Sequence, residues 1–366
     1  MKKAIFAVLV FILGLMLSGC EKKTYEYALV TDVGTISDQS FNQAAWEGLK
    51  KFGDEFGKTY HYYQPTCTGS GCEVQDADRI RAIDNAVKAG AKVIVMPGYL
   101  FGSIIDQMAD KYPNVKFIGI DVSSNNPKDN VKGIFFKDYE SGFLAGYAIV
   151  KDGKTNIGFM GGQAVPAVVQ YGIGYIAGSM LAANENNITN FKFPEDRYTY
   201  LNDFQPKDTH KTLATTWYNS GVEVIFACAG GAGLSVHDAA KDTNKLMIGV
   251  DVDQSFLEKV VTSAMKNIAD AVYEELVAIK DDKFQSGTIT KGVKEGGSGL
   301  PMKNSRFTSF NQTQYDAITN KIKNGEITVP STYDELVTFL TNLGYSAGDY
   351  PSRGLVDPQQ QKWFKN

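Results

Sequence analysis

Short apolar runs alternate with longer amphipathic stretches along most of the chain. The runs are compact and rich in β-branched or aromatic residues, which is typical of buried strands. Six of them are Tyr27–Thr31, Val93–Pro97, Phe117–Ile120, Ile157–Met160, Val224–Cys228 and Met247–Val250. Between the runs, apolar residues recur at helical spacing, as over Phe41–Phe52, Asp76–Ala89, Ser103–Tyr112, Lys207–Tyr218 and Leu234–Asp242. Apolar strands separated by helices predict an α/β protein with parallel sheets covered on both faces.

The length of the chain predicts two lobes rather than one. The chain has 366 residues, whereas single hydrophobic cores stop growing at about 250–300 residues. Because strand–helix–strand crossovers are right-handed, each lobe should be a doubly wound parallel sheet. Several chain crossings between the lobes would form a hinge with a cleft, a frequent place for ligands.

The expected division of the chain follows the order of the predicted elements. After an N-terminal segment 1–19, residues 20–138 should form the first lobe and residues 139–250 the second. Residues 251–290 should return to the first lobe through a strand at Val260–Ser263 and a helix at Met265–Lys280. Residues 291–366 should cross once more and form a helix at Gln312–Lys323 and a tail, mainly on the second lobe.

Polar residues stand where several predicted strands end. Asp32, Asp121 and Asp251 each follow an apolar run, and the turn Gly230–Gly233 follows another. Ligands of open α/β sheets bind beyond the carboxyl ends of the strands, so we expect these residues to meet in the cleft. Carboxylates accept hydrogen bonds from hydroxyls, which favours a sugar moiety. Taken one at a time, each Asp is also an ordinary helix cap or turn former.

The first twenty residues read as a secretory signal. Lys2 and Lys3 precede an apolar run, Ala4–Leu17, which is too short for a membrane-spanning helix of about 20 residues. The sequence Leu-Ser-Gly-Cys at 17–20 resembles the bacterial lipobox. That resemblance implies cleavage before Cys20, a diacylglycerol thioether on Cys20, and anchoring to the cell membrane on its extracytoplasmic face. The alternative is an ordinary cleaved signal followed by an incidental cysteine.

Composition excludes several other classes of function. The net charge is −4, and it becomes more negative if Lys2 and Lys3 are removed, so no basic surface for nucleic acid is expected. The three histidines are scattered and predict neither a catalytic triad, a metal site nor a cofactor site. The motif Gly172–Ala177 matches the dinucleotide fingerprint only by its letters, and we interpret it as a small-residue helix face for close packing.

Three further cysteines have structural explanations. Cys67 and Cys72 flank a short Thr-Gly-Ser-Gly loop, which makes them candidates for a local disulfide outside the cytoplasm. No second cysteine pair or nearby histidine completes a zinc site. Cys228 lies in an apolar run and is expected to be a small buried residue.

The segment 31–48, which reads TDVGTISDQSFNQAAWEG, resembles the basic membrane protein family. These PnrA-like lipoproteins serve ABC transporters as purine nucleoside receptors. Similar pieces recur in order over roughly residues 25–330, among them Gly-Val-Asp-Val-Asp-Gln at 249–254. The resemblance implies the type I periplasmic-binding-protein fold, a nucleoside ligand, permease and ATPase partners, a monomer, and no enzymatic activity.

The resemblance also implies a role for eight residues. Phe41 and Phe204 match the two rings that enclose the base, and Asp32 and Asn42 match positions that bond it. Positions around the ribose are matched by Asp121, Gly231, Asp251 and Lys266.

Some of these residues also fit plainer interpretations. Phe41 suits an apolar helix face, Asn42 the polar first turn of a helix, and Lys266 a solvated helix surface. At the level of function, the alternatives are a receptor for free sugars such as ribose, a surface nucleoside hydrolase, and a sensor or adhesion lipoprotein that binds no transported solute.

Overall fold

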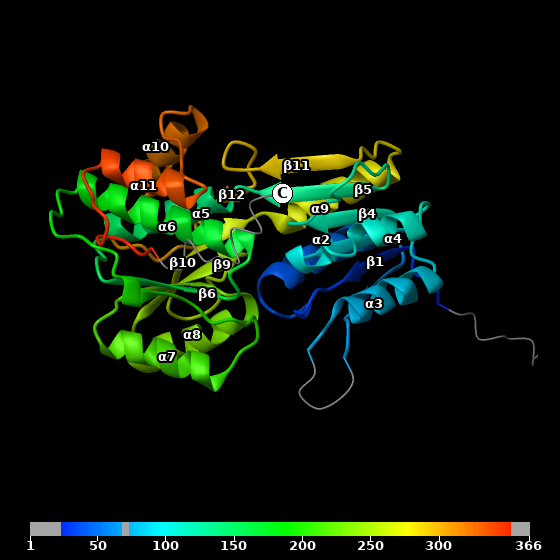
Figure 1. Cartoon of the computed structure of the whole chain (residues 1–366), viewed down its shortest axis with the longest axis horizontal. Helices are drawn as coiled ribbons and strands as arrows, with labels where there is room; N and C mark the ends of the chain where they lie inside the picture. The colour runs from blue at the N-terminus through cyan, green and yellow to red at the C-terminus, as the bar shows by residue number, and fades with distance from the viewer. Residues whose placement is uncertain (1–22, 68–72, 353–366) are drawn as a thin grey trace, which may run out of the picture.

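The computed structural model describes residues 23–67 and 73–352, and they form two α/β lobes side by side (Figure 1). The predicted signal segment and Cys20 lie outside the described residues. Each lobe is built on one six-stranded sheet. All strand pairs are parallel except the short pairing of β10 with β12. The predicted α/β class with two parallel-sheet lobes is confirmed.

The first sheet has the strand order β11-β5-β4-β3-β1-β2. Its strands are β1 (Tyr27–Val30), β2 (Tyr60–Tyr63), β3 (Val93–Pro97), β4 (Lys116–Ile120), β5 (Val131–Phe136) and β11 (Gly287–Lys291). One face packs against α2 (Phe41–Phe56) and α9 (Ile268–Lys280), and the other against α3 (Asp76–Lys88) and α4 (Ile105–Lys111). Successive residues of β1 alternate between these two cores, as the period of two in a strand requires.

The second sheet repeats the arrangement with the order β12-β10-β9-β8-β6-β7. Its strands are β6 (Ile157–Gly161), β7 (Tyr198–Tyr200), β8 (Val224–Cys228), β9 (Leu246–Asp251), β10 (Val260–Lys266) and β12 (Ser298–Gly299). One face packs against α5 (Asp138–Lys151) and α6 (Pro166–Glu185), and the other against α7 (Asp208–Asn219) and α8 (Gly233–Thr243). The last helices, α10 (Gln312–Lys323) and α11 (Tyr333–Asn342), join the same core as α5 and α6.

One element lies in the other lobe from the one predicted. The strand at Val260–Ser263 was expected to return to the first lobe, but β10 pairs in parallel with β9 of the second sheet. The return to the first lobe comes after Lys266, with α9 and β11. An apolar strand pattern indicates burial on both faces, and it does not say which of two sheets the strand joins.

Within the described residues, the chain therefore crosses between the lobes three times. The crossings run from β5 to α5, from β10 to α9, and from β11 to β12. Hydrogen bonds join them. The amide of Lys137 donates to the carbonyl of Lys291 over 2.9 Å, and that of Asn267 donates to the carbonyl of Gly297 over 2.9 Å. The three crossings form one hydrogen-bonded hinge.

The glycine-rich stretch 172–177 belongs to the middle of α6, where it packs closely against α5. A Cβ at Gly174 would stand 2.0 Å from the carbonyl oxygen of Tyr139, and one at Gly178 would stand 2.0 Å from that of Phe143. These positions therefore hold glycine because two helix backbones meet there, as the sequence predicted.

Candidate functional site

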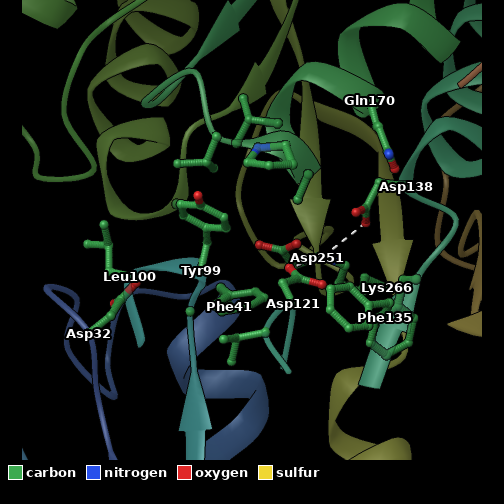
Figure 2. A pocket seen from close by; sticks show the side chains of 18 of the residues that line it. Asp32, Phe41, Tyr99, Leu100, Asp121, Phe135, Asp138, Gln170, Asp251 and Lys266 are labelled. Atoms are coloured by element: carbon green, nitrogen blue, oxygen red, sulfur yellow. Dashed lines mark hydrogen bonds and ion pairs between the residues drawn. The ribbon is translucent and has the colours of Figure 1, made fainter. Parts of the chain in front are cut away.

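A cavity of about 990 Å³ lies between the lobes. Side chains from both sheets point into it at the carboxyl ends of the strands (Figure 2). All eight residues singled out from the sequence line this one cavity: Asp32, Phe41, Asn42, Asp121, Phe204, Gly231, Asp251 and Lys266.

The N-terminal end of α2 carries the first group of lining residues. The carboxylate of Asp38 caps the helix, because it accepts hydrogen bonds from the amides of Asn42 and Gln43 over 3.0 and 3.1 Å. It also accepts one from the Asn42 side-chain Nδ2 over 3.0 Å. The remaining Oδ1 atom of Asn42 is buried and has no hydrogen-bond partner within the described part of the chain. The cap thus orients Asn42 and leaves one acceptor unused.

Asp32 leaves β1 in a tight turn that fixes its carboxylate. Oδ1 accepts hydrogen bonds from the amides of Val33 and Gly34, over 2.6 and 3.2 Å. Burial raises the pKa of Asp32, and the hydrogen bonds from these two amides offset only part of the rise. The other oxygen faces Gly98, where a Cβ would stand 2.3 Å away. Gly98 has φ +135°, a conformation that also favours glycine.

Asp121 and Asp251 occupy equivalent places in the two lobes. Asp121 follows β4 and Asp251 ends β9, each with a left-handed backbone, at φ +58° and +65°. Asp251 accepts a hydrogen bond from the Ser40 hydroxyl of the other lobe. Burial raises the pKa of Asp251 to about 6, although Lys266 acts in the opposite direction. Oδ1 of Asp121 is buried without a partner among the described residues.

Lys266 lies at the centre of a buried charge cluster. Its ammonium Nζ is 2.6 Å from Asp121 and 2.9 Å from Asp138, and its side chain is 1% exposed. Burial by itself lowers the pKa of Lys266, but Asp121, Asp138 and Asp251 outweigh burial and raise it. The interpretation as a solvated helix residue is wrong, because Lys266 ends the strand β10 and α9 begins only at Ile268.

Phe204 enters the cavity from the loop after β7. Its ring lies against Gly162, where a Cβ would stand 2.3 Å from the ring. Its carbonyl accepts a hydrogen bond from the Ala232 amide over 2.9 Å, which ties it to the glycine turn that includes Gly231. Phe41, on the other lobe, is half-buried beneath the same cavity.

Sequence reasoning missed two buried lining residues that carry polar groups. Asp138 begins α5 and is 3% exposed, and Tyr171 on α6 is 2% exposed with no hydrogen-bond partner for its hydroxyl in the described chain. The sequence signal for Asp138 was present, because this carboxylate comes two residues after the strand β5, as Asp32 does after β1. Tyr171 carries no such signal, because its ring fits an ordinary core position.

Comparison with known proteins decides the family. The family model described as ABC transporter substrate-binding protein PnrA-like matches residues 26–333. The chain belongs to this family. It is therefore a substrate-binding protein of an ABC transporter and not an enzyme.

Relatives of the PnrA-like family match nearly the whole chain. It is 32% identical to the ABC transporter nucleoside-binding protein BmpA of Lactococcus lactis, over 86% of this chain and 91% of the relative. It is 31% identical to basic membrane protein A of Borreliella burgdorferi, over 86% and 90%.

A solved structure supports the fold. An ABC transporter solute-binding protein from Aeropyrum pernix superposes with a TM-score of 0.75 at 22% identity, over 89% of this chain and 98% of that one. The fold is that of the type I periplasmic binding proteins.

The predictions for the other cysteines can also be compared with the structure of this PnrA-like chain. Cys67 is disulfide-bonded, and its predicted partner Cys72 lies outside the described residues. Cys228 is free and buried, as expected. Within residues 23–67 and 73–352, no group of three or more His, Cys, Asp or Glu side chains is placed to hold a metal ion, and no helix is long and apolar enough to cross a membrane.

Proposed function

We propose that the chain captures a purine nucleoside in the interlobe cavity and delivers it to the permease and ATPase subunits of its transporter. The observation that carries the proposal is the convergence of the eight residues named above on one cavity lined by both lobes. The nucleoside-binding description of the Lactococcus lactis relative supports the same ligand class.

The two rings suit a flat base. Phe41 comes from the first lobe and Phe204 from the second, and base–aromatic stacking is worth about 1–3 kcal/mol per base. The unused Oδ1 of Asn42 offers an acceptor to a donor on the base edge. Asp32, held by two amides, offers further acceptor capacity.

The charge cluster suits a sugar with vicinal hydroxyls. Asp121 keeps a buried oxygen that has no partner in the described chain, and a hydroxyl donated to it would satisfy that atom. Asp251 faces the same space from the other lobe. Lys266 supplies an N–H donor for a hydroxyl oxygen. Ligand bonds to both lobes would favour the closed arrangement.

Calorimetric titration tests the ligand class directly. The purified protein is titrated with inosine, guanosine, adenosine and free ribose. We expect at least one nucleoside to bind and ribose to bind far more weakly, because ribose lacks the stacking surface. Ribose binding as tight as that of the best nucleoside would indicate a sugar receptor instead. Absence of heat and of a thermal shift with all three nucleosides would contradict the proposal.

We also propose that the protein is held at the extracytoplasmic face of the cell membrane as a monomer, by lipid on Cys20. Two acyl chains anchor a protein where one is marginal. In cells fed radiolabelled palmitate, the wild-type chain should carry label and sediment with membranes. Cys20→Ser should lose both properties, and a labelled Cys20→Ser protein would refute the lipid assignment.

A further inference from the structure

The Lys266 ammonium has more partners than the proposed ligand contacts require. Besides Asp121, it pairs with Asp138, a residue without an assigned role. Figure 2 shows a dashed interaction line running from the Asp138 carboxylate toward the group of Asp121, Asp251 and Lys266. The Asp138 side chain is 4% exposed, so this ion pair is shielded from solvent.

Two partners and three rings fix the orientation of this ammonium. An ammonium has three N–H donors. One is donated to Asp121 over 2.6 Å, while Asp138 Oδ1 lies at ion-pair distance, 2.9 Å from Nζ, without a hydrogen-bond partner among the described residues. The rings of Phe41, Phe136 and Tyr171 surround the charge, with centroids 5.2, 5.4 and 5.9 Å from Nζ. The donors that Asp121 does not use are available to an acceptor in the cavity, and the two carboxylates restrict where the ammonium lies.

Asp138 also links this ammonium to the hinge. Asp138 opens α5 directly after the first crossing, and Lys266 ends β10 directly before the second. Next to them, the Ser141 hydroxyl donates to the Met265 carbonyl over 2.6 Å and accepts from the Gly299 amide of the third crossing over 3.1 Å. The base of the charge cluster is thus built from all three crossings.

We propose that Asp138 is a positioning residue, whose ion pair holds the Lys266 ammonium against the hinge so that an N–H donor of Lys266 faces the ligand. The proposal rests on the proposed nucleoside function. Asp138 itself makes no ligand contact in this proposal. Asp138 therefore affects ligand affinity only by placing Lys266.

A double-mutant cycle measured by calorimetry with inosine tests this route. Asp138→Asn keeps the shape and removes the charge, and it should weaken binding about tenfold or more, because residues in direct contact are strongly coupled. In a Lys266→Met background, the same change should alter affinity less than about twofold. Equal losses in both backgrounds would overturn the proposal.

Two further variants separate positioning from a general role in folding. Asp138→Glu restores the charge, and it should recover most of the affinity lost in Asp138→Asn. Glu140→Gln is the matched control. Glu140 lies in the same helical turn as Asp138 and is also a buried carboxylate at the hinge, where it accepts a hydrogen bond from the Val293 amide. Unlike Asp138, it does not line the cavity. Glu140→Gln should leave affinity unchanged, and a loss equal to that of Asp138→Asn would contradict a specific role for Asp138.

A crystal structure of Asp138→Asn tests the same claim without ligand. The ammonium should leave its place beside Asp121, and an unmoved Lys266 would refute the positioning role. If the wild-type protein binds no nucleoside, the proposed function fails, and this structure still decides whether Asp138 places Lys266.

Discussion

Asp121 and Asp251 hold a backbone conformation that most residues with a side chain avoid. Both have positive φ at the end of a strand, and such conformations cost about 1–3 kcal/mol unless the surroundings impose them. Both carboxylates, one in each lobe, are largely shielded from solvent: the Asp121 side chain is 10% exposed, and Asp251 is buried. Two acidic residues at equivalent places in the lobes thus share a conformation that is costly for most side chains, which fits the ligand contacts proposed for both.

The ionisation of Asp251 should cost stability. Burial raises its pKa from 3.8 to about 6, Lys266 lowers it, and Asp38 and Asp121 raise it. Because the folded state holds this proton more tightly than the unfolded chain, the resulting stabilisation is present below about pH 4 and is lost as the pH rises through about 6. Its size is at most about 3 kcal/mol.

Asp251→Asn removes this titration. Urea unfolding of the free proteins gives the free energy of unfolding of the variant and of wild type at each pH. The variant value minus the wild-type value should increase between pH 4 and pH 8. A difference that stays constant across this range would show that Asp251 does not titrate in this way. The variant should also bind nucleoside more weakly, because it loses a charged acceptor.

Phe41→Leu should separate stacking from core packing. Leucine keeps an apolar side chain on α2, but it loses about 1–3 kcal/mol of stacking, so nucleoside affinity should fall roughly fivefold to hundredfold. Phe56→Leu is the matched control, because Phe56 lies at the far end of the same helix and does not line the cavity. Unchanged affinity in Phe41→Leu would remove Phe41 from the site.

At the scale of the elements, the close pair of α5 and α6 places part of the site. Asp138 opens α5, and Tyr171 lies on α6. The two helices approach closely because Gly174 and Gly178 let the backbones meet. Any side chain at these glycines should push α5 away from α6 and disturb the first turn of α5.

Gly178→Ala should therefore destabilise the protein by about 1–3 kcal/mol, the usual cost of overpacking. Gly233→Ala is the control. It is also a helical glycine, but its Cβ would stand 3.7 Å from the nearest atom, so it should be neutral or slightly stabilising. Thermal unfolding of both variants measures the difference. Equal midpoints would show that the helices can separate at little cost.

Sequence patterns predicted those helices, strands and site residues that depend on the neighbouring residues in the chain. The strand-end rule found Asp32, Asp121 and Asp251, and the helical spacing over Phe41–Phe52 found α2. Other features depend on the tertiary structure. The half-exposed edge strand β2 lacks a continuous apolar run. Nothing in the sequence near Asp138 shows that Lys266 lies beside it.

At the scale of the whole molecule, the lobes touch each other directly. The Gln254 side chain donates to the Gln39 carbonyl over 2.8 Å, and the Gln205 side chain donates to the Val33 carbonyl over 3.2 Å. Ser40 and Asp251 form a third link. Each neutral hydrogen bond contributes about 0.5–1.5 kcal/mol, so these links favour the closed arrangement even without ligand.

Gln205→Ala should shift the free protein toward an open arrangement. Gln205 is exposed and does not line the cavity, so any loss of nucleoside affinity, expected to be about twofold to tenfold, would reflect closure alone. Small-angle scattering should show a larger radius of gyration for the free variant than for free wild type, and equal radii with ligand bound. Equal radii of the free proteins would contradict this account.

The three neighbouring chain passages restrict how one lobe can move relative to the other. A single passage would permit twisting and sliding, whereas three neighbouring passages leave mainly one rotation axis. Each time the halves come together, Phe41 and Phe204 therefore return to the same relative placement. Closure therefore costs little conformational entropy. The dissociation rate of the bound substrate should then depend on how often this one rotation opens the lobes.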